Sequence, residues 1–446
     1  MRSLQSARHP FPGEVGVGQA QSDFNFSTCR FMTSLVVKSF SLQRSPQAEA
    51  APRLPFAKPI ADSQTDSAVR ILGVGHDLSW MATPLFPAAD TMFGPRGAYL
   101  FSETGPLWVA DTGHHRLLGW RSPPTTDGQP ADWIIGQPDF NHEGQNAKGV
   151  PTANTVAAPT GICPCGEGMA VADAWNHRVL IWRRIPTDSH VPADVVLGHV
   201  NFTQNLPNRG ADSPAANTLH WPYGVFFHGG WLYVADTGNR RVLVWHGVPQ
   251  RPGQPADQVL GQELFTTRNE NDGGSPTAAS MRWPHSLTWW QGNLVMADAG
   301  NNRLMIWRGA PTQNNARCQV VLGQSKFQAV ELNRGEYFPT DRSLNMPYGV
   351  AAAGDWLLTA DTANSRLIGW RRPGLDREEL HDAPADGLLG QATYRQKGEN
   401  RAYGSALRDS FCWPYSIQVC GDVAAIADSG NNRVMLWRLE TQSRPY

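Results

Sequence analysis

Six aspartate–arginine pairs are the most regular candidates for chemistry in this sequence of 446 residues. In each pair the arginine follows the aspartate by five residues, and a tryptophan follows the aspartate by nine. A carboxylate and a guanidinium at this spacing could line a catalytic ring or join in a forked ion pair within each repeat. Because six identical copies imply a task repeated in every unit, we interpret the pairs as structural and expect each carboxylate also to accept N–H bonds from the turn that follows it. The pairs are Asp111–Arg116, Asp173–Arg178, Asp236–Arg241, Asp298–Arg303, Asp361–Arg366 and Asp428–Arg433.

A second set of candidate residues differs from copy to copy. A proline stands upstream of each aspartate, and the residue directly after it varies in type. Three phenols, an imidazole, a guanidinium and a hydroxyl that converge could bind a polar or anionic small molecule or a peptide side chain. The alternative is that the tyrosines pack on the prolines and plug a channel. The six residues are Arg96, Thr160, Tyr223, His285, Tyr348 and Tyr415.

Three tryptophans stand directly before prolines of this set, at Trp221, Trp283 and Trp413. They could form the walls of a pocket around the varied residues, or they could fill space between loops. Because large aromatic side chains most often serve packing, we interpret them as filler.

Histidines and cysteines give weak signals for metal or redox chemistry. His114, His115 and His177 occupy the slots just before the repeated arginine, where we expect solvated turn residues. Cys163 and Cys165 have no second pair at a ligand spacing, so we expect buried structural thiols. The sequence predicts neither a metal site nor a cofactor.

The elements that position these residues follow from an internal repeat, whose aspartates are 62, 63, 62, 63 and 67 residues apart. In each copy an apolar run follows the proline, and the Asp-to-Trp segment, such as VADTGNRRVLVW at Asp236, predicts a hairpin with Gly and Asn at its tip. A later segment of the type ILG or VLG predicts a fourth strand. Six copies of four short antiparallel strands predict an all-β fold, a six-bladed β-propeller.

The two ends of the repeat array predict how the ring closes. The last copy ends after Trp437 with no fourth strand, whereas an extra strand segment at 69–73 precedes the first copy. We therefore expect this N-terminal strand to complete the C-terminal blade, which removes two open sheet edges. The predicted organisation is a mostly disordered tail over 1–68, one propeller over 69–439 and a C-terminal tail over 440–446. Translation could start at Met1 or at Met32.

Chain connectivity indicates which face of the ring carries function. In a four-stranded meander, the turn between the second and third strands lies at the same end as the connection to the next blade. That connection is about twenty residues long here, while the turn between the first and second strands is short. Long loops on a rigid scaffold are the usual location of binding residues, and the six varied residues are expected at the channel mouth on this face.

The Pro-x-Gly and hydrophobic-Ala-Asp-x-Gly-Asn-x-Arg patterns resemble the NHL repeat over six units, roughly residues 69–439. The resemblance implies the propeller fold, and members of that family include RNA-binding domains, protein-interaction scaffolds and lyases. The zinc-dependent amidating lyases of the family place His after the proline in three blades. Here only His285 matches, while Tyr223, Tyr348 and Tyr415 are not such ligands, so that activity is not carried over.

Composition indicates which classes of partner and which compartment to expect for this protein. The formal charge is -1, and acids in the long loops offset their arginines, so nucleic acid is not an expected partner. No apolar run is long enough for a membrane span, and the sparse cysteines and the lack of a secretory signal favour the cytoplasm. We favour a non-enzymatic propeller that binds a protein or peptide through its long-loop face and channel mouth. The alternative is a small-molecule binding protein, or a lyase or hydrolase-type enzyme, with its site at that mouth.

Overall fold

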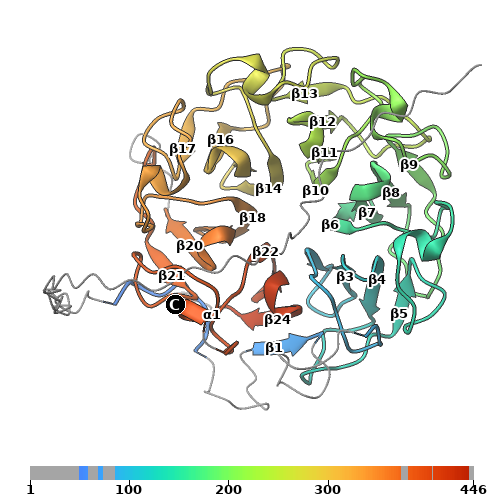
Figure 1. Cartoon of the computed structure of the whole chain (residues 1–446), viewed down its shortest axis with the longest axis horizontal. Coiled ribbons are helices and arrows are strands. Elements are labelled where there is room, and N and C mark those ends of the chain that lie inside the picture. The colour runs from blue at the N-terminus through green and yellow to red at the C-terminus, as the bar shows by residue number, and fades with distance from the viewer. Residues whose placement is uncertain (1–49, 59–68, 74–85, 373–379, 404, 441–446) are drawn as a thin grey trace, which may run out of the picture. The chain divides into compact units, whose positions relative to one another are not determined.

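The computed structural model describes residues 50–58, 69–73, 86–372, 380–403 and 405–440. The chain divides into two units, 1–48 and 49–446, and all described residues belong to the second. Within that unit, six four-stranded antiparallel sheets stand around a central axis (Figure 1). This arrangement confirms the predicted six-bladed β-propeller.

The first three blades follow the chain in order, and the strands of each run from the axis outward. Blade 1 contains β2 (Gly97–Leu100), β3 (Leu107–Asp111), β4 (Arg116–Trp120) and β5 (Trp133–Ile135). Blade 2 contains β6 (Pro159–Cys165), β7 (Gly168–Asp173), β8 (Arg178–Trp182) and β9 (Val195–Leu197). Blade 3 contains β10 (Pro222–His228), β11 (Trp231–Asp236), β12 (Arg241–Trp245) and β13 (Gln258–Leu260).

The remaining blades repeat this order, except that the last one takes its outer strand from the start of the described chain. Blade 4 contains β14 (Pro284–Trp290), β15 (Asn293–Asp298), β16 (Arg303–Arg308) and β17 (Val320–Leu322). Blade 5 contains β18 (Pro347–Ala353), β19 (Trp356–Asp361), β20 (Arg366–Arg371) and β21 (Gly387–Leu389). Blade 6 contains β22 (Pro414–Cys420), β23 (Val423–Asp428), β24 (Arg433–Arg438) and β1 (Val69–Leu72).

The ring closes as the sequence predicts, because β1 pairs antiparallel with β24. Val69 lies opposite Trp437, and Leu72 lies opposite Val434. The expected N-terminal tail lies mostly outside the described residues, at 1–49 and 59–68. Its described part, 50–58, packs on the propeller: Phe56 is fully buried, and Trp437 donates its Nε1–H to the carbonyl of Ala57 at 2.8 Å. This short segment therefore belongs to the folded ring.

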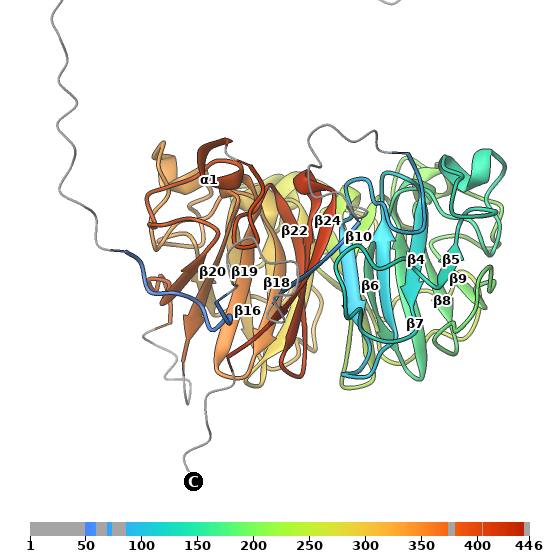
Figure 2. The same cartoon turned by 90° about the horizontal axis from the view of Figure 1, so that it is seen from below.

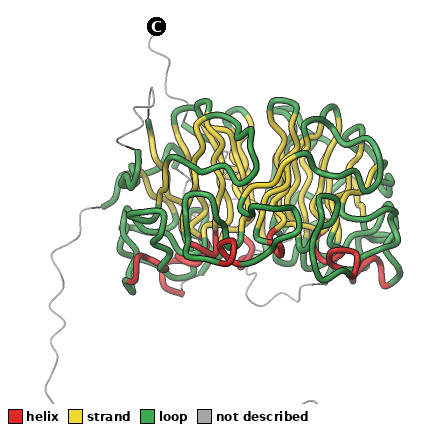
Figure 3. The backbone as a smooth tube through the Cα atoms, turned by 90° about the horizontal axis from the view of Figure 1, so that it is seen from above, coloured by secondary structure: helices red, strands yellow, loops and turns green. Residues whose placement is uncertain are grey.

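All the short helices of the described residues lie at one end of the blades (Figures 2 and 3). Five occupy the turn between the second and third strands, and five occupy the connection to the next blade, as the connectivity predicts. We call this side the long-loop face. The first group is η2 (Ala174–Asn176), η4 (Thr237–Asn239), η6 (Ala299–Asn301), η8 (Thr362–Asn364) and η9 (Ser429–Asn431). The second group is η1 (Gln145–Lys148), η3 (Pro207–Gly210), η5 (Glu270–Gly273), η7 (Leu332–Gly335) and α1 (Asn400–Tyr403).

The core lies between neighbouring blades, where both faces of each sheet are covered. The tryptophan that ends each third strand is buried there, and its Nε1–H donates to a loop carbonyl. In blade 3, for example, Trp245 donates to Gln254 at 3.1 Å. The packing role predicted for these tryptophans is therefore confirmed.

The repeated aspartate and arginine side chains are buried in every blade, and their geometry corrects part of the expectation. In blade 3 the Nε–H of Arg241 donates to Oδ2 of Asp236 at 2.8 Å. The ion pair is not forked, because the two terminal nitrogens of the guanidinium donate instead to loop carbonyls, among them Ala215 and Thr218, both at 3.0 Å. The arginine therefore ties the long loop before the blade to the hairpin.

The second oxygen of each aspartate also binds differently from the expectation. Oδ1 of Asp236 accepts the backbone N–H of His220 at 2.7 Å, from the loop that precedes the blade and not from the turn that follows. The turn contributes a side chain instead, since Asn239 donates its amide to Oδ2 at 2.7 Å. A carboxylate oxygen accepts more than one hydrogen bond, so one buried aspartate joins loop, turn and strand.

Candidate functional site

Five of the six varied residues form a closed ring of contacts at the long-loop end of the channel. The rings of Tyr223 and His285 are 4.8 Å apart, those of His285 and Tyr348 stack at 4.2 Å, and those of Tyr348 and Tyr415 are 4.6 Å apart. Arg96 completes the circle: its guanidinium lies 4.6 Å from the ring of Tyr415 and donates to the hydroxyl of Tyr223 at 3.0 Å. We call these residues the mouth ring. Their mutual packing agrees with the plug interpretation of the channel mouth.

Thr160 is the varied residue that stays out of the mouth ring. Its hydroxyl donates to the backbone carbonyl of Tyr223 at 2.8 Å, and only 2% of the residue is exposed. Because this small side chain leaves blade 2 without a member, Arg96 of blade 1 reaches across to blade 3. The mouth ring thus contains five of the six predicted residues, and all six line one channel cavity.

His285 is held neutral in the mouth ring. Burial, with the nearby charge of Arg96, lowers the pKa of its imidazole to about 4, although the bond to the Trp283 carbonyl opposes the shift. Nδ1 lies 2.9 Å from that carbonyl, which can only accept, so Nδ1 carries the proton. Nε2 is therefore a hydrogen-bond acceptor. Burial also raises the pKa of Tyr348 and of Tyr415, which keeps both phenols protonated.

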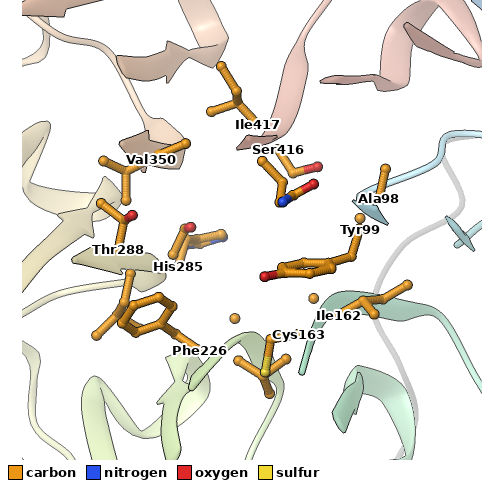
Figure 4. A pocket seen from close by; sticks show the side chains of 18 of the residues that line it. Ala98, Tyr99, Ile162, Cys163, Phe226, His285, Thr288, Val350, Ser416 and Ile417 are labelled. Atoms are coloured by element: carbon orange, nitrogen blue, oxygen red, sulfur yellow. The ribbon is translucent and has the colours of Figure 1, made fainter. Parts of the chain in front are cut away.

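Below the mouth ring, the inner strands enclose a channel cavity of about 370 Å³. Figure 4 shows Tyr99 turned toward its centre, with side chains from several blades around it, among them Phe226 and Thr288. The buried hydroxyl of Ser416 has no hydrogen-bond partner among the described residues. The cavity thus combines apolar walls with a few polar atoms.

A second cavity, of about 580 Å³, opens on the long-loop face where blades 6, 1 and 2 meet. We call it the rim pocket. Its walls include Phe93, Trp175 and Trp413, which are exposed by 45%, 46% and 48%. Polar groups at its lining include Arg96, His115 and Asn432.

The filler interpretation is wrong for two of the three tryptophans before the prolines. Trp413 lines the rim pocket, and Trp221 is exposed by 47%. Both have a left-handed backbone, with φ of 50° and 49°. Their N–H groups donate to side chains of the preceding blade, Ser365 and His177, which fixes the backbone while the indoles remain on the surface. Trp283, which has no such bond, is half-buried beside Arg282.

These bonds belong to a contact between successive blades that we call the blade clasp. The residue four positions after the repeated aspartate accepts the N–H of the residue before the next proline. His115, for example, accepts from Ala158 at 2.9 Å, and Asn302 accepts from Met346 at 2.8 Å. The exception is Arg240, which has no acceptor atom.

The histidines are not the solvated turn residues expected. His114 is fully buried, and its Nδ1 lies 2.8 Å from Oδ2 of Asp111, where other blades use asparagine. His177 is 9% exposed, and burial, followed by His220 and His199, lowers its pKa to about 3. The expectation fails because these slots point into the contact between blades. The buried thiols expected at Cys163 and Cys165 are confirmed.

Exposed large apolar side chains gather on one face. All thirteen of those among the described residues belong to loops and turns of the long-loop face. They are Phe86, Phe93, Val150, Trp175, Val200, Leu206, Trp221, Leu264, Leu332, Tyr337, Phe338, Leu407 and Trp413. The sequence predicted the face and singled out Trp221 and Trp413, although as filler. It did not indicate the other eleven side chains, because their exposure depends on how each loop packs.

The described residues contain no cluster of side chains suited to binding a metal ion. Within residues 50–58, 69–73, 86–372, 380–403 and 405–440, no three His, Cys, Asp or Glu side chains come together as a ligand set. Among the same residues, no helix has the length and hydropathy that crossing a membrane requires.

Comparison with known proteins gives likeness of fold alone. No family model and no curated protein matches the chain. Three similar solved structures are a protein of unknown function from Bacteroides thetaiotaomicron, virginiamycin B lyase from Staphylococcus aureus and hydrazine synthase of Kuenenia stuttgartiensis. Their sequence identities are 12%, 11% and 12%, and their TM-scores are 0.49, 0.41 and 0.42. The alignments cover 88%, 83% and 79% of this chain and 84%, 99% and 97% of those chains.

Proposed function

We propose that this protein is a binding module that docks a polypeptide partner on its long-loop face and has no catalytic role. The observation that carries the proposal is the gathering of all thirteen exposed large apolar side chains, among the described residues, on that face. Large apolar patches on an otherwise polar surface typically mark sites of protein interaction.

The composition of the face supports a polypeptide partner. Three tryptophans, Trp175, Trp221 and Trp413, are among its exposed side chains, and tryptophan is enriched in the residues that dominate binding energy at interfaces. The loops of this face also carry charged residues of both signs, such as Glu270 and Arg282, whose side chains lie 3.3 Å apart. Apolar anchors within a polar rim are typical of protein interfaces.

A second candidate function, small-molecule binding in the channel cavity, has one observation in its favour. The Ser416 hydroxyl is buried beside a cavity of about 370 Å³ and has no hydrogen-bond partner in the part of the chain that the structure describes, and the His285 Nε2 acceptor belongs to the same lining. A buried polar group without a partner is costly unless a ligand or water satisfies it. Native mass spectrometry of the purified protein tests this candidate, because a retained ligand would add a discrete mass that Ser416→Ala abolishes.

The cellular setting belongs to the same proposal. The five described cysteines are all free thiols, which supports a reducing compartment such as the cytoplasm. The likeness of the repeats to the NHL family supports a scaffold role, and the near-neutral charge of the chain gives no reason to propose nucleic acid.

Site-specific photo-crosslinking tests the proposed function. Benzoylphenylalanine is placed at Leu206 or Leu332, which are exposed by 60% and 53% on the long-loop face, and at Thr187 or Thr312 as exposed controls on the opposite face. We expect one defined polypeptide to crosslink from the first two positions in cells and not from the controls. Equal labelling from both faces would contradict the proposal. Crosslinks only to copies of this chain would also contradict it, because they would show that the face mediates self-association and does not bind a separate partner.

A further inference from the structure

Arg96 lines the rim pocket, and none of the described lining residues is acidic. Arg96 donates to the Tyr223 hydroxyl, and its guanidinium lies over the rings of Tyr223 and Tyr415. No ion pair joins it to an acidic residue within the part of the chain that the structure describes. Its remaining N–H groups have no hydrogen-bond partner among the described residues, so they can bind an anion, and guanidinium groups match carboxylates in geometry.

The neighbouring polar groups of the pocket also offer donors. Nδ1 of His115 accepts the N–H of Ala158 at 2.9 Å, and burial lowers the pKa of this histidine. The neutral ring therefore carries its proton on Nε2. Oδ1 of Asn432 accepts the N–H of Gly94 at 2.9 Å, which leaves the amide NH₂ as a donor. With Arg96, these donors favour a ligand that supplies acceptor oxygens.

The walls of the pocket favour a planar apolar group beside that anion. Phe93, Trp175 and Trp413 present about half of their surface to solvent, and the volume of about 580 Å³ exceeds what a carboxylate alone would occupy. The Nε1–H of Trp413 donates to Glu399 at 3.0 Å, which holds the indole in place. Aromatic rings pack well against such walls.

We infer that the rim pocket binds a carboxylate that carries an aromatic group, with Arg96 pairing the carboxylate and Trp175 and Trp413 enclosing the ring. The inference rests on the proposed function, because a polypeptide partner with an aromatic C-terminal residue carries a carboxylate and an aromatic ring on that one residue. The pocket would then anchor the chain end of a partner whose remaining surface contacts the long-loop face. A free aromatic carboxylic acid carries the same two groups, and the peptide titrations below distinguish it from a chain terminus.

The test is calorimetric titration of the purified full chain with N-acetyl-phenylalanine, with its carboxamide and with acetate. We expect the acid to bind at least about tenfold more tightly than the carboxamide, as a charge-assisted pair with Arg96 requires, and acetate to bind more weakly than either. Arg96→Gln should remove the preference for the acid, and Arg96→Lys should keep part of it, because lysine retains the charge.

A matched pair of variants tests the wall of the pocket. Trp413 and Trp221 occupy the same repeat position, with φ of 50° and 49° and exposures of 48% and 47%, but only Trp413 lines the rim pocket. Trp413→Ala should weaken the acid at least about tenfold, and Trp221→Ala should change it less than about twofold. Equal effects of the two variants, equal binding of acid and carboxamide, or no binding of the acid would each overturn the inference.

Peptides distinguish the source of the ligand. We expect Ala-Ala-Ala-Phe with a free C-terminus to bind more tightly than N-acetyl-phenylalanine, and its amidated form to lose that affinity. If the peptide binds no more tightly than N-acetyl-phenylalanine, the assignment of the ligand to a chain terminus is wrong. If the acid and the peptide bind but no partner crosslinks from the long-loop face alone, the proposed function is wrong and this inference stands. If a partner crosslinks from that face but neither compound binds, this inference is wrong and the proposed function stands.

Discussion

Arg241 and Asp236 meet at 2.8 Å inside blade 3, and both side chains are fully buried. The arginine uses its Nε–H for the carboxylate, its Nη2 for the loop carbonyls of Ala215 and Thr218, and its Nη1 for the carbonyl of Phe265. One guanidinium therefore holds both the hairpin of the blade and the long loop that carries the proposed binding face.

Arg241→Lys should destabilise the propeller strongly. Lysine keeps the charge but cannot reach the carboxylate and the loop carbonyls together, so buried acceptors lose their donors. We expect a loss of about 3 kcal/mol in the free energy of unfolding, measured by chemical denaturation. Arg251→Lys, at an exposed arginine of the same blade, is the control and should change little. Equal stability of the two variants would contradict the structural role of Arg241.

The blade clasp predicts a graded series at Asn302. Its Oδ1 accepts the N–H of Met346, whose backbone is left-handed with φ of 51°. Asn302→Ala leaves that N–H without its partner and should cost about 1–3 kcal/mol in the free energy of unfolding. Asn302→Ser should recover part of the loss, because Ser365 performs the same role between blades 5 and 6. If serine is no better than alanine, the acceptor is not what matters at this position.

Buried neutral histidines predict a loss of stability in acid. Burial lowers the pKa of His177 to about 3 and that of His199 to about 4, while the unfolded chain binds these protons near pH 6.5. Their contribution is therefore fully present above pH 6.5 and is lost as the pH falls toward 4. The expected slope in the unfolding free energy is about 1.4 kcal/mol per pH unit for each histidine.

A double variant isolates these two groups. His177→Asn and His199→Gln supply residues that other blades use at the same positions, as at Asn302 and Gln262. Denaturation curves between pH 4 and 7 should show a shallower pH dependence for the double variant than for the natural chain. Identical slopes would show that neither histidine is held neutral.

Ring closure can be tested at Ile71, which is 3% exposed in β1 and lies opposite Met435 of β24. Ile71→Asp places a carboxylate in the core and should detach β1 from blade 6, with loss of cooperative thermal unfolding. Ile71→Val, the matched control, should cost only about 1 kcal/mol. A melting temperature of Ile71→Asp equal to that of the natural chain would contradict closure by this strand.

Repetition made the fold readable from sequence. Six copies of one pattern indicate blade number, strand order and closure, because a segment that is ambiguous in one repeat can be interpreted from the equivalent segments of the other five. The same repetition favours a structural interpretation of Asp236 and Arg241, yet it could not show that Oδ1 of Asp236 accepts the N–H of His220. That bond joins the strand to a loop whose path is set by tertiary packing.

The candidate site was predictable only in part. Position after the proline identified Arg96, Tyr223, His285, Tyr348 and Tyr415, which do meet in one ring. Comparison of the same position between blades could not find the rim pocket, because it forms between blades 6, 1 and 2 from residues at different repeat positions. Exposure of each side chain there depends on how neighbouring loops leave space.

Equilibrium binding of the crosslinked partner, once purified, tests the central claim most directly. The affinity is measured for the natural chain, for Leu206→Asp with Leu332→Asp on the long-loop face, and for Thr187→Asp with Thr312→Asp on the opposite face. We expect the first pair to weaken binding at least about tenfold, because each places a charge in an apolar contact, and the second pair to leave the affinity unchanged. Unchanged affinity in the first pair, or an equal loss in both, would contradict docking on the long-loop face.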